Sequence, residues 1–319
     1  MAMERQTVRV RLGELDYLKC ALILLMVAFH LSYFSDLHPQ AKQVVYAFHM
    51  PAFLVISGYL MNMQKAPRAF LHTLWWYAVP YLVMESAYVV MASLVPIREH
   101  IDSLTVAVFF DKLLVHPLGP YWYLHTLVVC GLCSYGVFRF VRLGVLSQFL
   151  LLGLLLYGFS ALTDALSFSA ASYFLAGLAV RRSGWGFLRV FRASWLAVPV
   201  FVLLAVRPDG LHTGSVRSWL IVYMAVSSLL CFYPFLRGRL QAVILFVGRH
   251  TLLVFLFSPV FTLLCKGLLP FLRFDPTGLL FVGIAVPLAV GGSLFIGLLL
   301  DALHLSPYLL GWQAVERNF

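Results

Sequence analysis

Long apolar runs separated by short polar connections make up most of the chain. Each run approaches the roughly 20 residues that an α-helix needs to cross the hydrocarbon core of a bilayer. Because apolar residues follow one another without strict alternation, the pattern predicts a bundle of transmembrane helices and not a barrel. The ten predicted spans are 17–34, 44–61, 70–95, 121–141, 146–162, 168–180, 195–206, 216–236, 244–269 and 278–300.

The composition fits an all-α membrane protein with a single domain over residues 1–319. Of the 319 residues, 62% are hydrophobic and 11% are charged, whereas soluble domains carry about 25% charged residues. The polar connections are too short to form a separate soluble domain. A further apolar run at 105–115 is too short to cross a bilayer, and it predicts either a re-entrant or interfacial helix or a loop on the membrane surface.

The net charge of +10 reflects membrane topology in this interpretation, and no nucleic-acid partner is expected. With the N-terminus in the cytoplasm, roughly two thirds of the Lys and Arg residues fall in cytoplasmic connections, as the positive-inside rule requires. We therefore expect a multi-pass protein of the inner (plasma) membrane with both termini in the cytoplasm. The sequence leaves the oligomeric state open.

The five cysteines predict neither disulfides nor a metal site. All five lie in apolar runs, and their odd number argues against a disulfide framework. Cys130 and Cys133 form a CxxC pair, but the pair lies within a predicted span, and we expect no metal there.

A few ionisable side chains interrupt the spans, and four of them are expected at one depth. An ionised group at the bilayer centre costs about 2.5 to 3.5 kcal/mol on insertion scales, so each is a functional candidate. His30 and His49 are equally far from the hairpin tip near Pro39, and short connections make helices antiparallel neighbours. Glu85 and His125 are expected in the same layer. Any one histidine could be structural, but the four together predict a site.

Lys19 lies 11 positions before His30. At about 100° per residue the two side chains share one helix face, about 16 Å apart along the axis. That spacing suits a long ligand with an anionic end and a reactive end. The alternative is a lysine that extends to the lipid headgroups.

Two motifs resemble those of the acyltransferase-3 family of integral membrane acyltransferases, particularly sugar O-acetyltransferases such as fucose 4-O-acetylase. The first is Leu15, Asp16, Lys19 and His30; the second is Phe48, His49, Met50, Pro51, Ser57, Gly58, Tyr59 and Leu60. Lysine stands at position 19, where arginine is commoner in the family. Ser258 stands in a segment where relatives often carry a histidine.

The resemblance implies transfer of an acyl group, usually acetyl, from cytoplasmic acyl-CoA to a hydroxyl of a cell-envelope glycan or lipid-linked saccharide. It implies acyl-CoA as a co-substrate and no tightly bound cofactor. His30 is expected to act as general base, assisted by His49 and Glu85. Residues expected to hold the donor are Lys19, Ser57, Gly58, Arg68, Arg181, Arg182 and Arg249. Residues expected near the acceptor are His125, Trp122 and Tyr33.

Two other functions stay open from the residues alone. The intramembrane histidines and Glu85 could form the proton relay of a transporter or flippase, although the chain lacks the internal symmetry of many transporters. The protein could also be a non-catalytic partner in the assembly of an envelope polysaccharide. Direct transfer and a covalent acyl-histidine intermediate are both compatible with the sequence.

Overall fold

A computed structural model describes residues 12–95, 99–163, 165–206, 211–311 and 314–315. All regular elements within these ranges are helical. The two chain ends, for which a cytoplasmic location is predicted, include residues 1–11 and 316–319, which lie outside the described residues.

A helix lies at each predicted run. These helices are α1 (Gly13–His30), α3 (Pro39–Leu60), α4 (Pro67–Leu94), α6 (Trp122–Phe140), α7 (Val145–Thr163), α8 (Phe168–Arg182), α10 (Ala197–Val206), α11 (Val216–Leu230), α12 (Gly238–Arg249), α13 (Thr251–Leu264) and α15 (Leu279–Ala302). Among the described residues, seven helical stretches are long and apolar enough to cross a membrane: Pro39–Leu60, Pro67–Leu94, Gly119–Phe140, Val145–Thr163, Val216–Phe235, Thr251–Leu272 and Leu279–Ala302.

Three of the predicted spans fall outside these seven. α1 has 18 residues but includes the charged side chains of Glu14, Asp16 and Lys19. α8 has 15 residues and α10 has 10. The fold is therefore all-α with seven candidate membrane spans, and a count of ten crossings stays a prediction.

Two helix boundaries differ from the prediction. The first span ends at His30, because Leu31 adopts an extended conformation and the short helix α2 (Ser32–Leu37) follows. The ninth predicted span is broken at His250, which has φ −105° and ψ 22° and separates α12 from α13. Short polar stretches stand at both breaks, His30 and Ser32 at the first and Arg249 to Thr251 at the second, but hydropathy averaged over a whole span does not reveal them.

The remaining helical segments are short. They are α5 (Val106–Leu114), η1 (Gly119–Tyr121), α9 (Phe187–Val190), η2 (Tyr233–Phe235), η3 (Cys265–Leu268), α14 (Leu269–Leu272) and α16 (Ser306–Leu309). α5 occupies the short apolar run at 105–115, so the helical alternative is the observed one. It begins at Thr105, whose side chain accepts a hydrogen bond from the amide of Val108.

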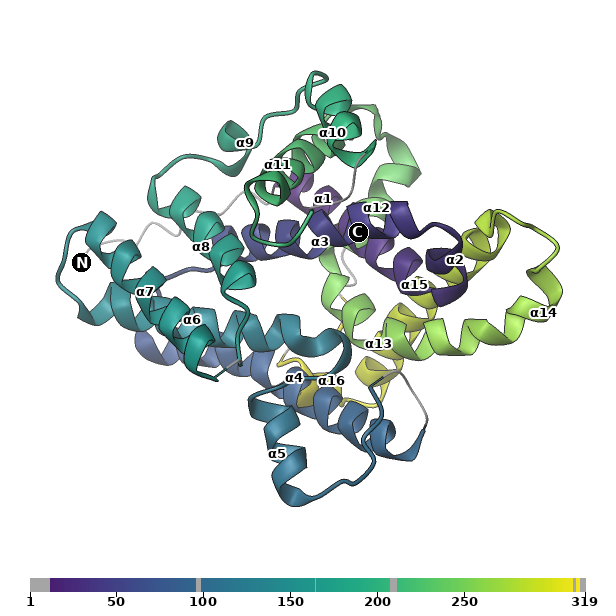
Figure 1. Cartoon of the computed structure of the whole chain (residues 1–319), viewed down its shortest axis with the longest axis horizontal. Coiled ribbons are helices and arrows are strands. Elements are labelled where there is room, and N and C mark those ends of the chain that lie inside the picture. Colours follow the sequence, from purple (N-terminus) through teal and green to yellow (C-terminus); the bar gives the residue numbers. More distant parts are fainter. Residues whose placement is uncertain (1–11, 96–98, 164, 207–210, 312–313, 316–319) are drawn as a thin grey trace.

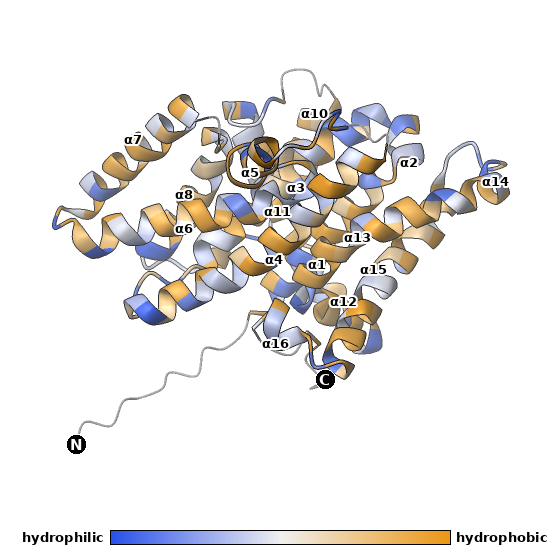
Figure 2. Cartoon of the chain, turned by 90° about the horizontal axis from the view of Figure 1, so that it is seen from below, coloured by the Kyte–Doolittle hydropathy of each residue, from blue (hydrophilic) through white to orange (hydrophobic). Residues whose placement is uncertain are grey.

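The helices form a bundle with α1 in its interior. α1 packs against α3, α11, α12, α13 and α15 (Figure 1). α7 lies at the edge of the bundle (Figure 2), and many of its hydrophobic residues are exposed, Leu150, Leu154 and Leu162 among them. An apolar outer surface of this extent is expected where helices contact lipid and not water.

α3 and α8 pack with their backbones in close contact. A Cβ atom at Gly58 would overlap with the carbonyl oxygen of Phe174, and a Cβ atom at Gly177 would overlap with the carbonyl oxygen of Val55. Small residues allow helix backbones to approach closely in membranes, where dispersion contacts drive association. The two glycines therefore fix the position of α3 against α8.

The tip of the α1–α3 hairpin is bonded to the connection between α14 and α15. His38 Nε2 lies 2.8 Å from the carbonyl oxygen of Thr277. The hydroxyl of Tyr33 donates to the carbonyl oxygen of Asp275 at 3.5 Å. The Asp275 carboxylate accepts hydrogen bonds from the hydroxyl and amide of Thr277 and from the amide of Leu280. These bonds, the Thr277 hydroxyl first, hold the pKa of Asp275 below its ordinary value.

Replacing either glycine of the α3–α8 contact should destabilise the protein. We expect Gly58→Ala and Gly177→Ala each to lower the free energy of unfolding by about 1 to 3 kcal/mol, because overpacking shifts backbone. Thermal unfolding in detergent micelles measures the effect. Gly158→Ala in α7 is the control, since a Cβ atom there meets nothing within 4 Å; alanine should be neutral or stabilising. Equal effects at all three positions would contradict this packing.

The Asp275 loop should make stability depend on acidic pH. Because the folded-state pKa lies below the unfolded value of about 3.9, the charged form stabilises the folded loop. This contribution is present above the unfolded pKa and is lost as pH falls through the folded pKa. Between about pH 5 and about pH 2, the melting temperature of wild type should fall more steeply than that of Asp275→Asn. The control is Asp102→Asn, whose side chain is fully exposed; parallel curves for wild type and Asp275→Asn would refute the expectation.

Candidate functional site

Two cavities enter the bundle from opposite ends of α1 and α3. We name them the lysine cavity, which is lined by Lys19, Ser57 and Lys65, and the histidine cavity, which is lined by His30 and His49. On α1 the lysine cavity is lined by Lys19 and Ile23 and the histidine cavity by the last residue, His30; on α3 they are lined by residues between 50 and 60 and between 46 and 54, respectively. Their volumes of about 360 and 330 Å³ lie at the lower end of the range for small-molecule sites.

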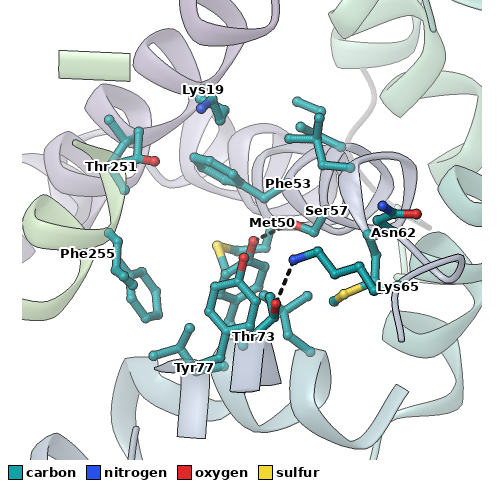
Figure 3. Close-up of a pocket in the computed structure, with 18 residues that line it drawn as sticks. Lys19, Met50, Phe53, Ser57, Asn62, Lys65, Thr73, Tyr77, Thr251 and Phe255 are labelled. Atoms are coloured by element: carbon teal, nitrogen blue, oxygen red, sulfur yellow. Dashed lines mark hydrogen bonds between the residues drawn. The ribbon is translucent and has the colours of Figure 1, made fainter. Parts of the chain in front are cut away.

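The lysine cavity combines cations, hydroxyl groups and apolar walls. Lys65 Nζ donates to Thr73 Oγ1 at 2.6 Å, a bond drawn as a dashed line in Figure 3. Ser57 Oγ and the hydroxyl of Tyr123 are 2.6 Å apart. The remaining walls are mostly apolar, as illustrated by Ile23, Phe53, Ile56, Leu124, Leu127, Leu252 and Phe255. The arrangement suits an elongated ligand with an anionic end and a largely apolar body.

Asp16 positions the cation of α1. Its carboxylate is 5% exposed and lies 2.7 Å from Lys19 Nζ and 3.8 Å from Arg249 Nε. A buried carboxylate needs such partners, because an unpaired charge is costly in a low-dielectric interior. The contact depends on Gly248 of α12, where a Cβ atom would overlap with the carbonyl oxygen of Asp16.

The two histidines of the histidine cavity have the same tautomer. His30 Nδ1 lies 2.7 Å from the Met26 carbonyl oxygen, and His49 Nδ1 lies 2.7 Å from the Val45 carbonyl oxygen. A carbonyl only accepts, so in the neutral imidazoles Nδ1 carries the proton and Nε2 carries a lone pair. Nε2 of His49 is buried and has no hydrogen-bond partner among the described residues. Both rings can therefore accept a proton at Nε2.

Tyr46 links the two imidazoles. Its ring centroid lies 5.9 Å from that of His30 and 5.3 Å from that of His49. The side chain of His30 is exposed, whereas His49 is 3% exposed. The predicted pairing of His30 and His49 at the hairpin is therefore observed, with the first ring open to the cavity and the second enclosed.

A proline in α3 recruits a second helix to support the His49 segment. Pro51 has no amide hydrogen, which leaves the carbonyl of Ala47 without its helical donor. Ser218 of α11 donates to that carbonyl at 3.3 Å. The hydroxyl of Tyr173, whose side chain lines the histidine cavity, lies 2.9 Å from Ser218 Oγ. This chain of hydroxyl groups ties the Pro51 segment of α3 to α8 and α11.

Glu85 and His125 lie apart from the two cavities. Glu85 is fully buried, and one carboxylate oxygen accepts from the amide of Leu118 at 2.5 Å. His125 Nε2 lies 3.1 Å from the carbonyl oxygen of Leu114. The two side chains bind backbone groups of Leu118 and of Leu114, the last residue of α5, and neither lines the lysine or the histidine cavity. The predicted group of four ionisable residues is thus divided into two pairs.

The other candidate residues are also distributed over several places. Trp122 lines the histidine cavity. Arg181 and Arg182 line a third cavity of about 420 Å³, where Arg181 donates to the carbonyl of Tyr59 and Arg182 lies over the ring of Phe138. Arg68 is exposed at the start of α4. Gly58 admits the backbone of α8 and not a ligand, and Tyr33 is bonded to the Asp275 loop.

Several lining residues were missed in the sequence. Lys65 stands in a polar connection, where the positive-inside rule already explains a basic residue as a mark of the cytoplasmic side. Its position therefore gave no reason to expect a ligand contact. The place of Tyr46 in the histidine cavity could have been predicted, because Tyr46 lies three positions before His49 and therefore on the same helix face. Thr73, Tyr77 and Tyr123 line the lysine cavity, but no spacing rule links α4 and α6 to that place.

Removing the Ser218 hydroxyl should destabilise the protein. We expect Ser218→Ala to cost about 1 kcal/mol or more, since the buried Ala47 carbonyl loses its donor. Ser227→Ala is a matched control on the same helix, because Ser227 Oγ is buried without a hydrogen-bond partner among the described residues; this change should be neutral or stabilising. Melting temperatures in one detergent provide the comparison. A neutral Ser218→Ala variant would show that this bond does not support α3.

Comparison with known proteins assigns the chain to a family. The profile of the acyltransferase 3 family, described as an acyltransferase domain, matches residues 12–298, which include both cavities. No curated protein and no solved structure is significantly similar to the chain. Because the match covers most of the 319 residues, the chain belongs to the acyltransferase 3 family of membrane-bound transferases.

Proposed function

We propose that the protein moves an acyl group, usually acetyl, from acyl-CoA to a sugar hydroxyl of a cell-envelope glycan or lipid-linked saccharide. The observation that carries the proposal is the pair of opposed cavities, one with two lysines and the other with two proton-accepting histidines. Membership of the acyltransferase 3 family supports a transferase over a transporter or flippase.

The lysine cavity is the donor site in this proposal. Lys19 and Lys65 offer point charges to the phosphates of acyl-CoA, and Arg249 next to Asp16 adds a third cation. The arm of the donor carries amides, which can exchange hydrogen bonds with Ser57 and Tyr123. Arg68, Arg181 and Arg182 lie outside this cavity and would meet the nucleotide end where it leaves the bundle.

The histidine cavity is the acceptor site. His30 accepts the proton of the sugar hydroxyl at Nε2, and the oxygen attacks the thioester carbonyl. The carbon–sulfur bond breaks, CoA leaves as the thiolate, and the proton of His30 neutralises that thiolate. His49 Nε2 can bind the hydroxyl or, in a two-step route, carry the acyl group. Trp122 provides an apolar surface for a sugar ring.

The proposed topology brings the two substrates from opposite sides of the membrane. Ten crossings with cytoplasmic termini put the lysine cavity on the cytoplasmic side of the plasma membrane, where acyl-CoA is made. The histidine cavity then opens toward the envelope. The distribution of basic residues supports this orientation.

Substitutions at the two cavities should affect different kinetic constants. With labelled acetyl-CoA and a panel of glycan acceptors, His30→Gln should lower kcat by about 100-fold or more and leave CoA binding unchanged. Lys19→Ala should raise the KM for acetyl-CoA by about tenfold, because a phosphate contact is lost. Transfer and equilibrium binding are both measured on purified protein in nanodiscs.

The matched controls are His100→Gln and Lys266→Ala, which change exposed residues that line neither cavity. Both should keep wild-type kinetics. A wild-type protein that neither binds nor consumes acyl-CoA would refute the proposed function. Wild-type turnover by His30→Gln would refute the role of His30 and leave the transferase intact.

A further inference from the structure

Met50 separates the lysine cavity from the histidine cavity. Among the described residues, Met50 is the one whose side chain lines both. It follows His49 directly and precedes Pro51, so its backbone lies in the segment that Ser218 ties to α11. Figure 3 shows Met50 among the side chains that line the lysine cavity.

The residues around Met50 are stiffer than Met50 itself. Phe53 and Tyr123 face the lysine cavity, whereas Leu54 and Trp122 face the histidine cavity. Aromatic rings move as rigid plates, whereas methionine has three rotatable side-chain bonds and a polarisable thioether that adapts to different neighbours. The side chain of Met50 is partly buried and can change rotamer without moving the α3 backbone. It is therefore the adjustable part of the wall between the cavities.

A donor in the lysine cavity can react only at this wall. The thioester carbonyl has to reach an acceptor oxygen next to His30 or His49, and attack requires the reacting atoms about 3 to 3.5 Å apart. The acyl group leads the sulfur atom along that path, so it is the part of the donor that lies against Met50. Space at Met50 then limits the size of the group that can be presented.

We propose that Met50 is the specificity-determining residue for acyl length, closing the passage between the two cavities to groups much larger than acetyl. This inference rests on the proposed function, because it assumes an acyl-CoA donor in the lysine cavity. It concerns the size of the acyl group, which the proposed function leaves open.

Kinetic selectivity tests the proposal. The ratio of kcat/KM for butyryl-CoA to that for acetyl-CoA should rise about tenfold or more in Met50→Ala, the discrimination that a few methylene groups give in an apolar pocket. Met50→Trp should lower acetyl transfer by about 100-fold while the Kd for CoA stays within about twofold, because the passage is blocked beyond the donor site. Met50→Leu, which conserves volume, should keep the wild-type ratio.

Met84→Ala is the control for loss of a methionine side chain. Met84 packs against the core and lines neither cavity, so the selectivity ratio should stay at the wild-type value. Melting temperatures of all variants establish that they are folded. An unchanged ratio in Met50→Ala, or wild-type acetyl transfer by Met50→Trp, would overturn the role of Met50 while the wild type remains active. A wild-type protein that transfers no acyl group from any acyl-CoA would overturn the proposed function and this inference with it.

Discussion

The close contact between α3 and α8 is the constraint on which the rest of the structure depends. Backbone meets backbone at Gly58 and Gly177, so α8 holds the C-terminal half of α3 in place. The two cavities lie along the same helix, the lysine cavity beside Ser57 near its C-terminal end and the histidine cavity beside Tyr46 and His49 near its middle. The contact between α3 and α8 therefore sets the positions of both cavities, although neither glycine carries a side chain that could take part in a reaction.

Backbone hydrogen bonding explains several of the buried polar side chains. In a bilayer each unsatisfied backbone group costs several kcal/mol, so irregular segments need partners from the protein. Ser218 donates to the carbonyl that Pro51 leaves without a helical donor, Glu85 accepts from the amide of Leu118 before η1, and His125 bonds the carbonyl of Leu114 at the end of α5. His30 and His49 differ from these three side chains. Each bonds a carbonyl of its own helix through Nδ1 and keeps Nε2 available.

The sequence predicted the helices well because apolar run length is a physical requirement of the bilayer. The pairing of His30 and His49 was also predictable, since a short hairpin brings equidistant positions to one depth. Glu85 was not, because depth along a helix says nothing about which way a side chain points. The break at His250 and the crossing at Gly58 depend on tertiary contacts with α1 and α8, which a single apolar run does not encode.

The crowding of α3 limits how this helix can change in length during evolution. Inserting or deleting one residue between His49 and Gly58 would rotate the rest of the helix by about 100° and shift it by about 1.5 Å. Gly58 would then leave α8, and Ser57 would leave the lysine cavity. We therefore expect homologues to vary in length in the connections and to keep the number of residues across this stretch constant.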